Sequence, residues 1–303
     1  MKLIFTFLLF TCLTTISFSQ KGKNGAGTIS ATGTVVNTYT SVTSDLAVGA
    51  LTINVVSNMS LTVGDLIMII QMQGASMDIN TNPITWWGGN YSVSNSTWND
   101  LNAGDGSTIE AKRHEWGTVT NYNNAGKYEL AEVISTTATS ITVRCGLKNA
   151  YTASGHVQVV KIPRYTTLTL NPGATIVPAA WNGTTGGVVA LEVDGNINFG
   201  AGSKISATGF GFRGGVKDNS SNGPGLPTDI GKPGYVDATN GAEKGEGIGG
   251  SSLAGGELDV TYMSRYGCGA PANGGGGGNY KNAGGGGGAN VGTGTYNGKG
   301  VPN

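Results

Sequence analysis

The chain is poor in charge, in histidine and in cysteine, and these shortages exclude several classes of function. Charged residues make up 12% of the 303 residues, with 18 basic and 18 acidic side chains. A chain without net charge has no general attraction for nucleic acid or for an anionic membrane surface, so we expect no nucleic-acid partner. The two histidines, His114 and His156, are neither spaced as a metal pair nor accompanied by a cysteine pair. We therefore expect no metal site and no cofactor.

A long hydrophobic run occurs only at the N-terminus. Lys2 precedes an apolar stretch over residues 3–16, and small residues stand just before Gln20. This pattern is typical of a secretory signal peptide over residues 1–19, cleaved before Gln20. A membrane-spanning helix needs about 20 apolar residues, so we expect no transmembrane segment. The mature protein is then expected to be secreted or to lie on the outer cell surface.

Two cysteines, Cys145 and Cys268, remain after removal of the signal peptide. In an oxidising compartment a disulfide between them is chemically allowed. The alternative is a free Cys145 that is buried within the strand SITVRC.

Residues 20–162 contain short runs of Val, Ile, Thr and Tyr bounded by Gly, Asn, Asp and Ser, which is typical of β-strands and turns. We predict an all-β fold that begins with one β-sandwich or barrel-like domain over 20–162, interrupted by an insertion at 77–115. The nearly continuous hydrophobicity of 64–73 predicts a strand buried on both faces, whereas 156–162 alternates. The predicted strands cover 33–42, 50–56, 64–73, 115–123, 127–135, 139–145 and 156–162.

Residues 163–212 contain a repeat. A shift of 23 residues places LTLNPGATI, which begins at Leu168, on LEVDGNINF, which begins at Leu191, so that apolar positions and turns coincide. A strand, turn and strand at this period are typical of a β-solenoid, in which stacked rungs bury a common interior. The alternative is two similar hairpins in a sandwich. The solenoid predicts these inward side chains: Leu168, Leu170, Ile176, Leu191, Val193, Ile197 and Phe199.

Residues 213–303 form a glycine-rich region with glycine pentads at 274–278 and 284–288. Such a composition usually indicates a flexible linker. The region also contains five tyrosines and follows directly on Phe210 and Phe212, and a linker has no use for such aromatic residues. We expect part of it to consist of extended glycine segments whose backbones contact and hydrogen-bond one another directly.

The insertion carries a cluster of aromatic side chains, Trp86, Trp87, Tyr91 and Trp98. Exposed aromatic rings on a long loop often stack on sugars or form binding hot spots. These four residues are therefore the candidate ligand-binding site, with a surface polysaccharide or glycan as the candidate partner. The alternative is that the rings form a small satellite core that caps the domain.

Motifs for catalysis are weak. The sequence has no GxSxG nucleophile motif, and the pairs Glu110 with Glu115 and Glu192 with Asp194 are of a kind that any β-rich chain supplies. We expect no catalytic residues and no enzyme activity. The rival hypothesis is a polysaccharide-active β-solenoid enzyme, a lyase or glycoside hydrolase, and a third is a purely structural spacer.

Several segments resemble a known family. QKGKNG, GDLIMIIQMQGASMD, WNGTTGGVVALEVDGNINF, ISATGFGFRGG and GAPANGGGGG are similar to the N-terminal region of large adhesin-like surface proteins of the Bacteroidota, which the type IX system exports. The resemblance implies a secreted adhesin-like or structural binding module. Such proteins end in a C-terminal sorting domain, whereas this chain stops at GKGVPN. We therefore expect it to be a fragment of a longer chain with further domains.

Overall fold

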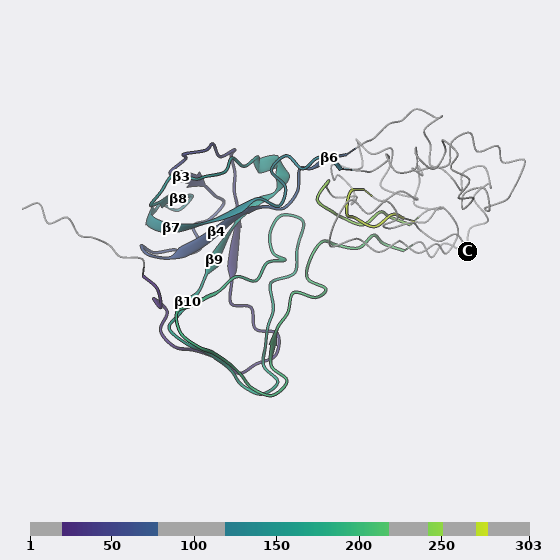
Figure 1. The fold of residues 1–303 in the computed structure, drawn as a ribbon. Helices are drawn as coiled ribbons and strands as arrows, with labels where there is room; N and C mark the ends of the chain where they lie inside the picture. Colours follow the sequence, from purple (N-terminus) through teal and green to yellow (C-terminus); the bar gives the residue numbers. More distant parts are fainter. Residues whose placement is uncertain (1–19, 78–118, 218–241, 251–270, 278–303) are drawn as a thin grey trace, which may run out of the picture.

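The chain folds as an all-β protein, as predicted. The computed structural model describes residues 20–77, 119–217, 242–250 and 271–277, which contain fifteen strands and one short 3₁₀ turn at Ala153–Gly155. Figure 1 shows a curled sheet with a stack of short strands beside it and a further glycine-rich part. The predicted signal peptide, residues 1–19, lies outside the described residues.

A six-stranded antiparallel sheet forms the first unit and curls into a barrel-like shape (Figure 1). Its two outer strands approach each other at a bridge between Val42 and Val55, which brings the ends of the sheet together. The barrel-like form of the prediction is therefore confirmed. In order across the sheet the strands are β2 (Thr38–Ser41), β9 (Val157–Ile162), β4 (Leu66–Gln71), β7 (Tyr128–Thr136), β8 (Ser140–Val143) and β3 (Thr52–Asn54).

The barrel interior is filled by alternate residues of these strands. Ile67 and Ile69 of β4 pack with Val133, Ile141 and Val159, all without exposed surface. Burial of β-branched side chains from every strand explains why the short strands form despite a high content of turn residues.

The burial of β4 and β9 is the reverse of what their sequences predict. β4 alternates between partly and fully buried positions, whereas β9 is buried on both faces. The cause is residues 186–190, which cross the outer face of β2 and β9. Gln158 donates to the Gly186 carbonyl at 3.0 Å, and the Tyr39 hydroxyl donates to the Val188 carbonyl at 2.7 Å. The outer face of β4 is left partly open.

Short parallel strands stack beside the barrel as three solenoid rungs. β1 (Gly27–Ile29), β11 (Leu168–Leu170) and β14 (Ile197–Phe199) form one wall of the stack. β10 (Arg164–Tyr165) pairs with β13 (Glu192–Val193), and β12 (Thr175–Ile176) pairs with β15 (Lys204–Ile205).

The predicted solenoid register is wrong, although the stacking is parallel. Leu168 lies opposite Ile197 and not Leu191, which is opposite no residue of β11. The shift of 23 residues matched two apolar strand and turn patterns that lie on different walls, because the segment that crosses the barrel lengthens the true repeat.

The first rung comes from the N-terminal residues, which the prediction had assigned to the barrel domain. β1 pairs with β11, and Thr34 forms a parallel bridge with Ile176. The segment was not predicted as a strand because GTI is short and polar. The barrel is thus inserted between the first and second rungs of the solenoid.

Burial within the solenoid decreases toward its last rung. Leu168, Leu170 and Ile176 are fully buried, and Leu191 and Val193 pack against them. Ile197 and Phe199 are 38% and 55% exposed, so their predicted burial is wrong. Both lie on the terminal described rung, and no further strand of the described chain covers them.

Part of the glycine-rich region is ordered through direct backbone contact, as expected. The Gly245 amide donates to the Gly275 carbonyl at 2.6 Å. A Cβ added to Gly274 would lie 2.5 Å from the Gly245 carbonyl oxygen, so only glycine permits this approach. β5 (Ser76–Met77) and β6 (Val119–Asn121) form a two-stranded arm beside this segment. The second pentad lies outside the described residues.

Candidate functional site

An open apolar groove of about 470 Å³ lies between the outer face of the barrel and the solenoid. The groove exists because residues 186–190 cover the outer face of β9 and leave that of β4 and β7 partly uncovered. Leu130 of β7 is 54% exposed there. The walls of the groove are aliphatic except for one carboxylate. The lining residues are Leu66, Met68, Leu130, Ile162, Val189, Ala190, Leu191, Glu192 and Ile205.

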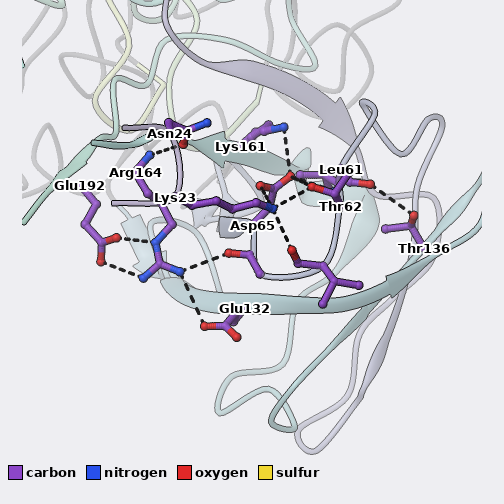
Figure 2. A network of polar contacts seen from close by, with 12 residues as sticks. Lys23, Asn24, Leu61, Thr62, Asp65, Glu132, Thr136, Lys161, Arg164 and Glu192 are labelled. Atoms are coloured by element: carbon purple, nitrogen blue, oxygen red, sulfur yellow. Dashed lines mark hydrogen bonds and ion pairs between the residues drawn. The ribbon is translucent and has the colours of Figure 1, made fainter. Parts of the chain in front are cut away.

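Arg164 anchors a polar network at one end of the groove (Figure 2). Its side chain is 2% exposed and binds the Glu192 carboxylate through both Nε and Nη2. Its Nη1 lies 3.6 Å from Oε2 of Glu132 on β7 and donates to the Gly64 carbonyl at 3.2 Å. Arg164 therefore ties the second and third rungs to the barrel.

Asp65 is the second centre of this network. Its Oδ1 lies 2.6 Å from the Lys23 ammonium group, and its Oδ2 lies 3.0 Å from that of Lys161. Burial raises the pKa of Asp65, but hydrogen bonds from Lys23, the Thr62 amide and Lys161 outweigh it and hold the pKa below its usual value. The carboxylate is thus charged at neutral pH and fastens the N-terminal segment to the barrel.

A separate polar centre lies at the start of the glycine-rich region, where Arg213 donates through Nη1 to the Asn182 carbonyl at 3.3 Å. Glu246 is 5% exposed and accepts hydrogen bonds from the Nε and Nη2 atoms of Arg213 at 2.9 and 3.0 Å. Burial raises the pKa of Glu246, but the hydrogen bonds from Arg213 outweigh this effect, so the pKa lies below its usual value. Trp181 packs nearby, edge-on against both His156 and Phe212.

The lining of the groove suits apolar groups better than sugars. Sugars present many hydroxyl groups that need hydrogen-bond partners, and aliphatic walls offer none. The one carboxylate of the groove, Glu192, is already bound to Arg164. The groove suits apolar side chains of a polypeptide.

The structure places only some of the candidate residues. Of the carboxylate pair considered for acid and base catalysis, Glu192 binds Arg164, and Asp194 lies 3.9 Å from Lys21. Cys145 is exposed, so the expectation of a buried Cys145 is wrong. The strand ends at Val143, two residues earlier.

Other predicted residues lie outside the described part of the chain. This holds for the four aromatic residues of the insertion, for the pair Glu110 and Glu115, for His114, and for Cys268, whose pairing with Cys145 stays a prediction. His156, the first residue of the predicted strand 156–162, instead ends the 3₁₀ turn with a φ of 53°.

Arg164, Asp65 and Lys23 were not predicted as residues of the site. A signal was present, because arginine within the apolar stretch VVKIPRYTTLTL requires a buried anion. The groove had no signal, since it depends on which strand the crossing segment covers. In the parts of the chain that the structure describes, no helix is long and apolar enough to cross a membrane, and no three His, Cys, Asp or Glu side chains gather as a metal site.

Comparison with known proteins gives no family. No protein-family model and no curated protein matches the chain. Among solved structures, similar chains include the tailspike gp61 of Pseudomonas phage phi297, with a TM-score of 0.25 and 11% identity over 60% of this chain and 23% of the tailspike. The Gp54 tailspike of Acinetobacter baumannii bacteriophage AP22, solved in complex with capsular saccharide, gives a TM-score of 0.26 and 16% identity over 60% of this chain and 28% of that protein.

A third tailspike, gp49 of Pseudomonas phage LKA1, gives a TM-score of 0.23 and 14% identity over 50% of this chain and 24% of that one. The matched part of this chain spans about a quarter of the length of these tailspikes.

Proposed function

We propose that the chain is a non-catalytic module of a secreted, adhesin-like surface protein that presents an aromatic binding loop on a rigid β-scaffold. The observation that carries this proposal is that three carboxylates are each held in an ion pair that connects two parts of the fold. Glu192, Asp65 and Glu246 are each bound by basic side chains. A glycosidase acid needs a carboxyl group whose pKa is raised, and the pKa values of Asp65 and Glu246 are lowered.

The placement of the insertion supports the binding role. Residues 78–118 connect β5 to β6, and these two strands form the arm that extends from the barrel (Figure 1). The arm is held by the glycine-rich segment, because the Gly74 and Ala75 amides both donate to the Ile248 carbonyl. A firmly held base lowers the entropy lost when a loop binds its ligand. We propose that a surface polysaccharide or glycan is bound by Trp86, Trp87, Tyr91 and Trp98.

A glycan-binding assay tests this assignment. We expect the purified chain to be retained on polysaccharide or glycan arrays, and the double variant Trp86→Ala, Trp87→Ala to lose retention while its melting temperature falls by no more than a few degrees. Tyr122→Ala, at an exposed aromatic residue of the arm, is the matched control and should bind normally. If the double variant unfolds instead, the rings are core, since truncation of a buried Trp costs about 3–5 kcal/mol.

Incubation with a panel of polysaccharides separates this proposal from the rival enzyme. We expect no release of reducing ends or unsaturated sugars. Reproducible release that Glu192→Gln or Glu110→Gln abolishes would establish the polysaccharide-active enzyme in its place.

A further inference from the structure

The third rung of the solenoid, residues 191–205, ends the described stack with an uncovered apolar layer. In the wall of β1, β11 and β14, Ile29 is 7% exposed and Leu170 is 0% exposed, whereas Phe199 on the third rung is 55% exposed. The next wall repeats the trend, with 0% at Ile176 and 37% at Ile205. Exposed apolar side chains on an edge strand are the features by which another strand is added.

The strands of this rung also have a free edge. β14 pairs with β11, β13 with β10, and β15 with β12, and within the described ranges none has a partner on its other side. The apolar groove opens at the same place, because Leu191, Glu192 and Ile205 belong both to the rung and to the groove lining. The uncovered layer and the groove are thus one continuous surface.

The rung is complementary to itself when it is reversed about Asn198. Reversal places Ile197 opposite Phe199, and Leu191 opposite Ile205, so apolar residues meet apolar residues. It places Glu192, whose carboxylate also binds Arg164 of its own copy, opposite the basic Lys204, and it places Val193 opposite Ser203. The turn DGN is brought against the turn GAG. An antiparallel pair of β-strands favours such aromatic, branched and oppositely charged neighbours.

The side-chain directions fit the same arrangement. Val193 packs on the solenoid core, as does Ile176, the register partner of Ile205. The alternation of a strand then turns both Glu192 and Lys204 outward. The charged pair therefore meets on the outer surface while the apolar pairs meet inside.

We propose that two copies of this chain associate through their third rungs, end to end, about a two-fold axis at Asn198. A two-fold contact requires one surface to complement itself, and the match of apolar and charged residues on both halves of the rung meets that requirement. A strand from an unrelated partner would require no such internal symmetry. The inference does not depend on the proposed ligand or on the absence of catalysis.

Sedimentation velocity over a range of concentrations tests the association. We expect the purified chain to form a dimer, and Phe199→Lys to raise its dissociation constant at least about tenfold. At concentrations where both proteins are monomeric their melting temperatures should agree, because Phe199 is exposed in the monomer. Val48→Lys is the matched control, at a valine 67% exposed on the barrel, and should dimerise normally. A chain that is monomeric throughout, or a dimer that Phe199→Lys does not weaken, would overturn the proposal.

Cross-linking tests the axis itself. In a Cys145→Ser, Cys268→Ser background, Asn198→Cys should form an intermolecular disulfide under mild oxidation, because each new thiol faces its own copy. Asn196→Cys, two residues away, faces Gly200 of the second copy and should not cross-link. Equal cross-linking of the two variants, or none at Asn198→Cys, would contradict the two-fold register.

Discussion

Arg164 connects three segments through one nearly buried guanidinium group. It binds Glu192 of the third rung, Glu132 of the barrel and the Gly64 carbonyl (Figure 2). Breaking a buried ion pair leaves an uncompensated charge, which is more costly than the pair is favourable. The stability of the joint between barrel and solenoid therefore depends on this side chain.

We predict that Arg164→Met lowers the free energy of unfolding by about 3–5 kcal/mol. Arg144 offers a matched control, since it also binds Glu132, at 2.5 Å, but its side chain is 37% exposed. Arg144→Met should cost less than about 1 kcal/mol. Chemical denaturation of both variants measures the difference, and equal losses would show that burial of Arg164 adds nothing.

Asp65 predicts how stability depends on pH. Its pKa in the folded protein lies below that of an unfolded aspartate, about 3.9. Its contribution is therefore complete above that value and is lost as pH falls through the folded pKa. We expect the difference in unfolding free energy between the native chain and Asp65→Asn to be largest near pH 6 and to shrink toward pH 3. The same comparison with Asp194→Asn, at a half-exposed residue, should give a small difference at every pH.

The contact between glycine segments gives a prediction at the scale of elements. Gly274→Ala should loosen the pairing of Gly245 with Gly275, because its Cβ would meet a carbonyl oxygen at 2.5 Å. Gly211→Ala is the control, because nothing lies within 4 Å of an added Cβ there. Hydrogen exchange at the Gly245 amide is the measurement. We expect faster exchange in Gly274→Ala alone, and unchanged exchange would mean that the segments can shift apart without cost.

The sequence predicts most strands but not how they are covered. Alternation and β-branched content identify the six barrel strands, since these are local properties of each segment. The exchange of roles between β4 and β9 depends on where residues 186–190 cross, which no local pattern contains. The parallel stacking of solenoid rungs was predicted, but the predicted register was wrong. Two apolar strands around a turn have the same sequence pattern on whichever wall of the solenoid they lie.

The candidate site was predictable to a smaller extent. Glu192 was singled out as one of a catalytic pair, and the structure instead binds it to Arg164. Such a partner cannot be chosen from sequence, since 18 basic residues compete for 18 acidic ones. The strand β1 is short and polar, so it could be identified as a strand only through its pairing with β11, which is distant in the sequence.

At the scale of the whole molecule, the N-terminal rung should be required for the solenoid but not for the sheet of the barrel. A chain that begins at Asn37 lacks β1 and exposes one side of Leu168 and Leu170, which are fully buried. We expect its β11 amides to exchange hydrogen much faster than those of a chain that begins at Gln20, while amides of β4 stay protected. Retained protection of β11 would show that the lower rungs suffice.

The insertion of the barrel between two rungs also sets an order of events during synthesis. Thr32 reaches its partner Gly173 across 141 residues, so the first rung leaves the ribosome well before the strand on which it stacks. At typical elongation rates of about 5–20 residues per second the wait is roughly 7–30 s. The barrel has every one of its strands available within that time, whereas β1 has none of its contacts. GTISATG is short and polar, which is why the strand was not predicted from the sequence. The same properties reduce the tendency of this unpaired strand to aggregate with other chains before β11 is synthesised.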